Sequence, residues 1–158
     1  AMVVADLPAG STVQVVNVMD VTVATGTTTM NHDDTIPQNT EGDEYMTLAI
    51  TPTHASNKLL IEVVAFIASN GAGRNNVMAL FQDSTAGALS SAAHQNPADG
   101  AGIPILLTHY MTSGTTSETT FKIRAGGNTG TLTWTGQAAG RKHGGVLAST
   151  MTITEIKV

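Results

Sequence analysis

The chain has 158 residues, enough for one domain that buries roughly 70% of the surface of its unfolded chain. Only 12% of the residues are charged and the net charge is −5, so the basic excess that binds nucleic acid or anionic membranes is absent. There is no cysteine, which excludes disulfides and thiolate metal sites. The apolar runs are no longer than a strand and predict no insertion into a membrane.

These apolar runs are separated by turn residues, for example at Asn70–Gly73 and Gly126–Gly130. No window of helical length keeps an apolar stripe, and Ala86–Ala93 comes nearest to one. We expect an all-β protein, an antiparallel β-sandwich or jelly roll in a single domain over residues 11–158, preceded by a linker or tag remnant over residues 1–10. The nine expected strands are Thr12–Val18, Val21–Thr27, Tyr45–Thr51, Lys58–Ala68, Val77–Gln82, Ile103–Met111, Thr119–Arg124, Thr131–Thr135 and Val146–Ile156.

Three positions within these runs carry specific expectations. Pro104 cannot donate a ladder hydrogen bond, so it belongs at a sheet edge or at the start of a strand. In the last run Met151 and Ile153 lie on one face of the expected strand, but Ile156 lies on the opposite face. This switch indicates a bulge or a change of neighbouring strand. Trp134 is the single tryptophan and is expected to anchor the core or an interface.

The run Lys58–Ala68 is apolar on both faces of the expected strand. Alternate residues from Leu59 to Ile67 share one face, while the other face carries Leu60, Val64 and Phe66 and only Glu62 as a polar residue. A strand whose second face meets water should alternate with polar residues, so another surface must cover this one. The simplest cover is a second copy of the chain. The expected interface residues are Leu60, Val64, Phe66, Met78 and Leu80.

Several segments, in this order along nearly the whole chain, resemble a domain that is widespread in the structural proteins of tailed bacteriophages. They are Gly10–Val16, Asp33–Gly42, Leu48–Pro52, Ala55–Ile61, Ala79–Thr85, Thr119–Arg124 and Ser149–Ile156. The resemblance implies a homotrimeric jelly roll of tumour-necrosis-factor-like type, located on the virion as a tail-fibre or spike end or as a capsid decoration. Its implied partners are other copies of the chain, other virion proteins and host surface polysaccharide. It transfers no catalytic motif.

Acidic residues are densest at Asp33, Asp34, Asp43 and Glu44. If the intervening loop folds back, these four carboxylates could surround Ca²⁺, which takes six to eight oxygen ligands. Alternatively, the two pairs cap a turn and a strand start. The spacing is not that of an EF-hand, and we expect no metal and no cofactor. The same carboxylates could form a glycosidase pair, but no aromatic platform accompanies them.

Two polar loops are candidates for contacts with sugars. Arg141, Lys142 and His143 lie between glycines and could hold acidic sugars or phosphates through charge-assisted hydrogen bonds. The second loop, Asn70–Asn76, offers Arg74, Asn75 and Asn76, whose guanidinium and amide groups can recognise hydroxyl patterns. Both loops could equally be solvated turns.

Enzymatic motifs are missing. No serine lies in a G-x-S-x-G elbow, no glycine loop has the pattern of a phosphate-binding loop, and the histidines lack metal-ligand spacing. We expect a non-enzymatic structural protein of a phage particle, with host glycans as candidate ligands. The alternatives are a stand-alone lectin-like module and a polysaccharide-degrading spike domain.

Overall fold

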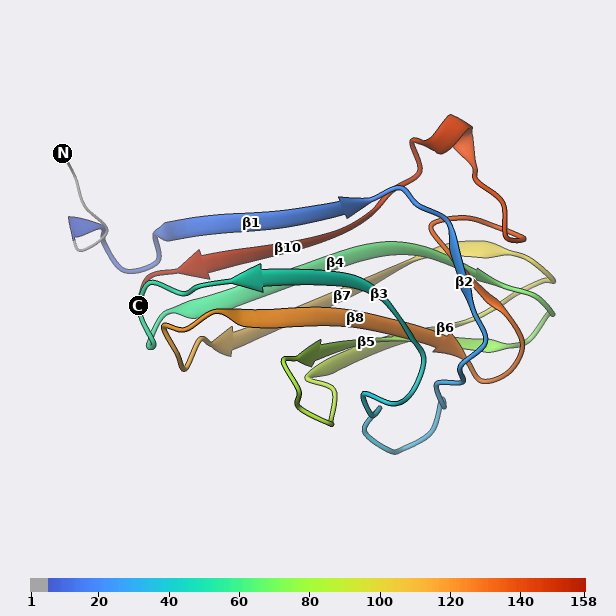
Figure 1. Cartoon of the computed structure of the whole chain (residues 1–158), viewed down its shortest axis with the longest axis horizontal. Helices are drawn as coiled ribbons and strands as arrows, with labels where there is room; N and C mark the ends of the chain where they lie inside the picture. The colour runs from blue at the N-terminus through green and yellow to red at the C-terminus, as the bar shows by residue number, and fades with distance from the viewer. Residues whose placement is uncertain (1–5) are drawn as a thin grey trace.

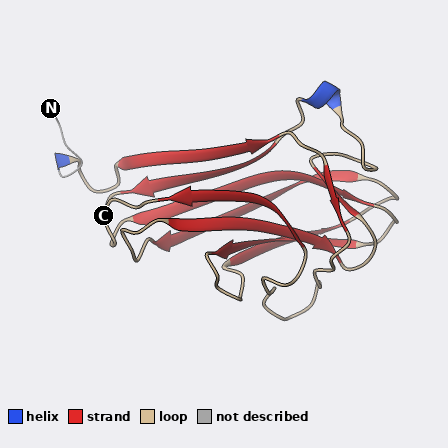
Figure 2. Cartoon of the chain, viewed as in Figure 1, coloured by secondary structure: helices blue, strands red, loops and turns tan. Residues whose placement is uncertain are grey.

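The computed structural model describes residues 6–158, and nearly all of their regular structure is β-strand (Figures 1 and 2). A short 3-10 helix, η2 (His143–Gly145), lies between β9 and β10. The strands are β1 (Thr12–Asp20), β2 (Ala24–Gly26), β3 (Asp43–Ile50), β4 (Lys58–Ser69), β5 (Asn75–Gln82), β6 (Ser90–Gln95), β7 (Gly102–Thr112), β8 (Thr119–Gly127), β9 (Leu132–Trp134) and β10 (Ser149–Ile156).

The strands form two antiparallel sheets with jelly-roll connectivity. One sheet has the order β1-β10-β4-β9-β2, with β7 also paired to β4, and the other has the order β3-β8-β5-β6. The pairs of long strands are nested along the sequence: β1 pairs with β10, β3 with β8, β4 with β7, and β5 with β6. This nesting is what a rolled-up pair of antiparallel ribbons produces. The predicted all-β jelly roll is confirmed.

The core lies between the two sheets and follows the expected alternation. Leu59, Ile61 and Ile67 of β4 have no exposed surface, whereas Val64 on the opposite face is 44% exposed. Phe121 and Ile123 of β8 also point into the core, while Lys122 and Arg124 lie on its outer side. Period-2 geometry therefore sorts these strands as the sequence predicts.

The outer face of β5, in the four-stranded sheet, is covered by the chain itself. Val77, Ala79 and Phe81 of β5 form a small second core with Met30, which comes from the loop between β2 and β3. Gly126 makes this close approach possible, because a Cβ there would lie 2.6 Å from the carbonyl oxygen of Thr28. β5 is therefore buried on both faces.

This cover corrects two interface assignments. Met78 and Leu80 have no exposed surface and point into the main core between the sheets. Their prediction as interface residues was wrong, because the apolar second face of β5 belongs to Val77, Ala79 and Phe81 and is filled from within the chain.

Other departures from the predicted strands have local causes. The segment nearest to a helix contains instead the strand β6, whose Ser, Ala, His and Gln residues carry little strand propensity. The expected strand Val21–Thr27 shortens to β2. The change of parity near Ile156 reflects a register shift in the neighbouring strand, between Thr12 and Gln14 of β1, and β10 itself continues regularly along β4.

Two further expectations are confirmed. Pro104 lies near the start of β7, a strand that, among residues 6–158, pairs with β4 alone. Trp134 is fully buried in the core, where its ring stacks on Tyr45 with 4.9 Å between centroids and its Nε1 donates to Asp20 Oδ2. Burial raises the pKa of Tyr45 above its ordinary value, and the nearby charge of Asp43 adds to the shift.

Candidate functional site

The six-stranded sheet has an outer face that no other part of the described chain covers as Met30 covers β5. We call it the exposed sheet face and define it by the outward residues of β1, β10, β4 and β7. The large apolar residues on it are Val15 (54% exposed), Met19 (64%), Val64 (44%), Leu106 (65%) and Tyr110 (57%). Exposed apolar side chains gathered over four neighbouring strands mark a surface that binds another surface.

Cross-strand pairing arranges this face in rows. One apolar row runs Met19, Thr150, Val64, Leu106, and a second runs Val15, Thr154, Leu60, Tyr110. Between them lies a polar row of Asn17, Thr152, Glu62 and Thr108, in which Asn17 Nδ2 donates to Thr152 Oγ1 at 2.8 Å. Two apolar bands around a polar one give both contact area and hydrogen-bonding groups that can fix the register of a partner.

Three of the expected interface residues lie on this face. Val64 is exposed, Leu60 is half-buried, and Phe66 is half-buried because its ring lies against the backbone at Gly102. Sequence reasoning missed Val15, Met19, Leu106 and Tyr110, although their even spacing along β1 and β7 was a usable signal. Their placement on one surface needed the strand pairing.

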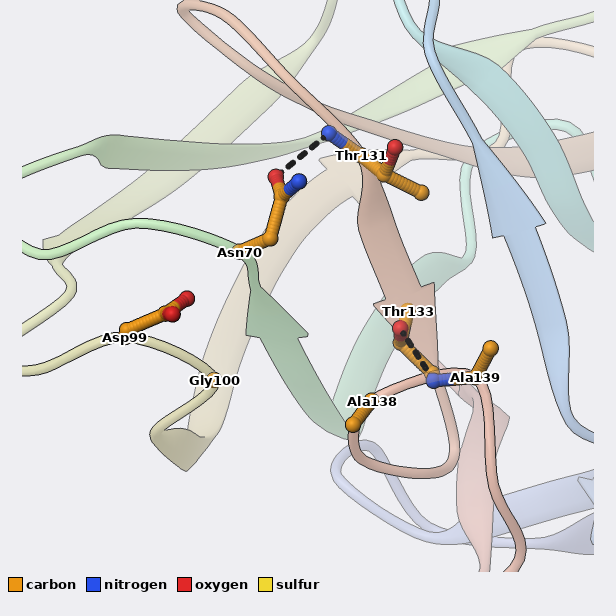
Figure 3. Close-up of a pocket in the computed structure, with 7 residues that line it drawn as sticks. All are labelled: Asn70, Asp99, Gly100, Thr131, Thr133, Ala138 and Ala139. Atoms are coloured by element: carbon orange, nitrogen blue, oxygen red, sulfur yellow. Dashed lines mark hydrogen bonds between the residues drawn. The ribbon is translucent and has the colours of Figure 1, made fainter.

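A second feature is a cavity at the far end of the sandwich, which we call the loop-end pocket (Figure 3). Its volume is about 430 Å³, within the range of small-molecule sites. It lies beyond the end of β4, whereas Val158 donates its N–H to Asn57 beside the start of β4. At about 3.3 Å per residue, β4 separates the two ends by about 36 Å, and Figure 1 shows the C-terminus at the opposite end. The lining residues are Asn70, Asp99, Gly100, Thr131, Thr133, Ala138 and Ala139.

Buried hydrogen bonds hold the loop that carries Asp99. The side chain of Asn96 is fully buried, and its Nδ2 donates to the carbonyl oxygens of Ser69 (2.8 Å), Gly71 (3.1 Å) and Ala98 (2.7 Å). Asp99 Oδ1 accepts from the N–H of Gly71. The hydrogen bonds from Asn96 hold the loop, and the bond from Gly71 holds the carboxylate of Asp99 itself.

The opposite wall of the pocket is a tight turn over residues 137–140. Gln137 and Gly140 exchange two backbone hydrogen bonds, and Ala138 and Ala139 between them have φ of +50° and +58°. Non-glycine residues rarely adopt this left-handed region. The N–H of Ala139 donates to Thr133 Oγ1 at 3.2 Å, which ties the turn to β9 (Figure 3).

The residues predicted to bind sugars do not line this pocket, although their loops border it. Arg74 donates to Asn70 Oδ1 and to the Thr129 carbonyl oxygen, so its guanidinium supports the pocket wall. Asn75 is half-buried, and its N–H donates to Asn128 Oδ1. Asn76 is fully buried with its amide against His94, so its assignment as a ligand-binding residue was wrong.

Arg141, Lys142 and His143 follow the turn over residues 137–140. Arg141 and His143 are exposed and Lys142 is half-buried. Within the described part of the chain, no hydrogen bond or ion pair engages these three side chains. They remain a candidate contact for an anionic group.

The acidic residues do not gather. Asp33 accepts from the Oγ1 and N–H of Thr35, and these bonds lower the pKa of the carboxyl group. Asp43 accepts from Thr28, while Glu44 lies 3.6 Å from Arg124 and 3.9 Å from Lys122. No cluster of three or more potential metal ligands exists among residues 6–158. The weak metal site suggested for Asp33, Asp34, Asp43 and Glu44 was wrong, because turn and strand contacts use these groups separately.

Glu155 is a carboxylate that the sequence analysis did not single out. It has no exposed surface and accepts hydrogen bonds from Asn57, Gln14 and Thr53, at distances of 2.6–2.9 Å. Burial acts to raise the pKa of Glu155, but these hydrogen bonds outweigh burial and hold the pKa below its ordinary value of 4.5. With all its acceptors used inside the fold, Glu155 closes the end of the core.

No protein-family model and no curated protein matches the chain. Among solved structures, dimeric latent PorU from Porphyromonas gingivalis is 13% identical (TM-score 0.44), and the match covers 95% of this chain but only 14% of PorU. Eiger TNF from S. frugiperda is 10% identical (TM-score 0.44), with 86% and 85% of the two chains covered. The EclA C-terminal domain, a sugar-binding protein, is 16% identical (TM-score 0.38), with 83% and 79% covered.

A phage protein is also among the matches. The enzymatically active domain of Bacteriophage CBA120 tailspike protein 4 is 13% identical (TM-score 0.29), and the match covers 76% of this chain and 18% of that one. At these identities and TM-scores the matches carry no conclusion about function. Within residues 6–158, no helix has the length and apolarity that a membrane crossing requires.

Proposed function

We propose that this chain is a non-enzymatic structural domain of a phage particle, which assembles as a homotrimer through the exposed sheet face. The observation that carries the proposal is the pair of exposed apolar rows on β1, β10, β4 and β7, with Leu106 at 65% and Met19 at 64% exposure. Burying such an apolar surface against another surface is favourable, and this free energy is not gained while the surface stays exposed to water.

A comparison within the molecule supports self-association. On β5 the apolar outer residues are covered by Met30 of the chain's own loop. On β4 no described segment supplies such a cover, although the strand is as apolar. In a ring of three copies, the exposed sheet face of each copy would pack against an adjacent surface of the next copy, and Glu62 and Asn17 of the polar row can fix the alignment.

The phage and trimer components of the proposal come from the sequence resemblance. The order of its motifs over nearly the whole chain supports a virion location, and its trimeric architecture gives the copy number. The nested strand pairs agree with the jelly roll that the resemblance implies.

Sedimentation equilibrium tests the proposed assembly. We expect a mass three times the chain's 16.2 kDa for the unaltered protein. Leu106→Asp places a carboxylate in an apolar row and is expected to give a monomer, because an unpaired charge cannot be buried cheaply. The matched control is Ala49→Asp, at an exposed position on the outer side of β3, which should leave the mass unchanged. A monomeric unaltered protein would refute the assembly.

A second function, recognition of host surface glycans, is supported by the loop-end pocket. It lies at the end of the sandwich away from Val158, where a partner can reach it without displacing the exposed sheet face. A trimer would present three such pockets, and weak individual contacts would gain avidity.

A further inference from the structure

We propose that the loop-end pocket binds a neutral sugar unit through two adjacent hydroxyl groups, one donating to Asp99 and the other accepting from Asn70. The proposal rests on the second function above and gives it a site and a ligand class. Asn70 begins one of the loops that the sequence analysis named, whereas Asp99 and Thr131 lie outside both of those loops.

The polar atoms that face the pocket have unused hydrogen-bonding capacity. Asp99 Oδ1 accepts from Gly71, but no hydrogen bond within residues 6–158 engages Asp99 Oδ2. The same holds for Asn70 Nδ2 and for Thr131 Oγ1. The pocket therefore offers a carboxylate acceptor, an amide donor and a hydroxyl that can do either.

The orientation of the Asn70 amide is set by its neighbours. Its Oδ1 accepts from the N–H of Thr131 at 2.8 Å and from Arg74. With both donors on the oxygen, the Nδ2 group of Asn70 is left without a hydrogen-bond partner among residues 6–158, and Figure 3 shows the bond from Thr131 to the oxygen. Arg74 thus acts as a positioning residue for Asn70.

Such fixed groups lower the cost of binding. The Asn96 side chain holds the loop of Asp99 through one buried and two partly buried hydrogen bonds, and Thr131 and Arg74 hold Asn70. Little side-chain entropy remains to be lost when a ligand binds. A carboxylate beside an amide matches adjacent sugar hydroxyls, because one hydroxyl donates to the acid while its neighbour accepts from the amide.

The remaining walls suit the carbon skeleton of a sugar. Gly100, Ala138 and Ala139 line the pocket with backbone and methyl groups. A volume of about 430 Å³ holds a monosaccharide unit with some water. Asp99 is the only charged residue in the lining, so a sugar that carries a carboxylate would be repelled.

Titration of the ¹⁵N-labelled full chain by two-dimensional NMR tests the site. The neutral probes are the methyl pyranosides of glucose, galactose and mannose, and glucuronic acid is the acidic probe. We expect at least one neutral probe to shift the amides of Gly100, Thr131 and Ala139, with no shift from glucuronic acid. Asp99→Asn keeps an oxygen for the Gly71 N–H but replaces the free acceptor, and should weaken binding about tenfold. Thr131→Val should weaken it by a smaller factor.

Glu118→Gln is the control, because Glu118 is exposed, lies outside the pocket lining and should leave the affinity unchanged. If none of the neutral probes shifts any amide, both the glycan function and this site are refuted. If a probe binds but shifts amides elsewhere, or binds Asp99→Asn unchanged, the site alone is refuted. Binding of glucuronic acid at the pocket amides would overturn the assignment of a neutral ligand.

Discussion

Glu155 illustrates how one buried carboxylate depends on residues from two other parts of the chain. Asn57, Gln14 and Thr53 all donate to it, and their bonds hold its pKa below the ordinary 4.5. A carboxyl group with a depressed pKa stabilises the fold above its unfolded pKa, and this stabilisation is lost as the pH falls through the folded pKa. The folded chain should therefore be sensitive to acid at this position.

Glu155→Gln tests this contribution. At neutral pH we expect the variant to have a lower free energy of unfolding, because its NH₂ group faces donors. Below pH 4.5 the difference from the unaltered protein should shrink, because the unfolded chain takes up a proton at Glu155 more readily than the folded chain, whose pKa is lower. Urea denaturation at a fixed protein concentration measures both values. Glu118→Gln, at an exposed position, is the matched control and should follow the unaltered protein. A gap that stays constant below pH 4.5 would contradict the assignment.

At the scale of elements, β5 and the loop between β2 and β3 form a unit. Met30 has no exposed surface and packs on Val77, Ala79 and Phe81. Met30→Ala should therefore lower the free energy of unfolding by about 3 kcal/mol, because it leaves a cavity over the sheet. Ile36→Ala removes an exposed side chain (65%) from the same loop and should change it by no more than about 0.5 kcal/mol. Chemical denaturation compares the two, and similar losses would show that the loop does not act as a cover.

The sequence predicts which face of a strand points to the core only where the residues on its two faces differ in polarity or size. The faces of β4 and β8 were assigned correctly because alternate residues differ in size and polarity, as Phe121 and Lys122 do. On β5 both parities are apolar, so the sequence could not tell Met78, which points to the main core, from Phe81, which points to the loop. β6 was missed because its small and polar residues form a strand only by pairing with β5.

The site could be predicted only in part for a similar reason. The loops at Asn70 and Arg141 were recognised from their composition, but the pocket joins Asn70, Asp99 and Thr131, which strand pairing brings together from distant positions. No local pattern marks Asp99 as different from other turn aspartates. Likewise, Leu60 and Val64 were found from one strand, whereas Met19 and Leu106 joined them only through the registers of three strand pairs.

For the whole molecule, the two sheets have different outer surfaces. In the four-stranded sheet, the loop between β2 and β3 covers the apolar outer residues of β5. The six-stranded sheet keeps an exposed apolar face, which we assign to contacts between copies. The pocket lies at one end of the sandwich, so assembly and ligand binding use separate surfaces. Leu106→Asp should therefore abolish assembly while leaving the affinity of the pocket for a neutral sugar unchanged, as NMR titration of the variant would show. Loss of sugar binding on dissociation would instead mean that the site needs a neighbouring copy.

The most direct test of whether other copies cover the exposed sheet face is the oxidation of Met19 by hydrogen peroxide, measured by peptide mass spectrometry. Met19 is 64% exposed in the single chain, whereas Met30, Met46, Met78 and Met151 are almost fully buried. Sulfoxide formation requires access to the sulfur. If copies of the chain cover the face, Met19 should oxidise slowly in the unaltered protein and many times faster in Leu106→Asp. Equally rapid oxidation of Met19 in both proteins would show that this face stays open to water, and would contradict the assembly.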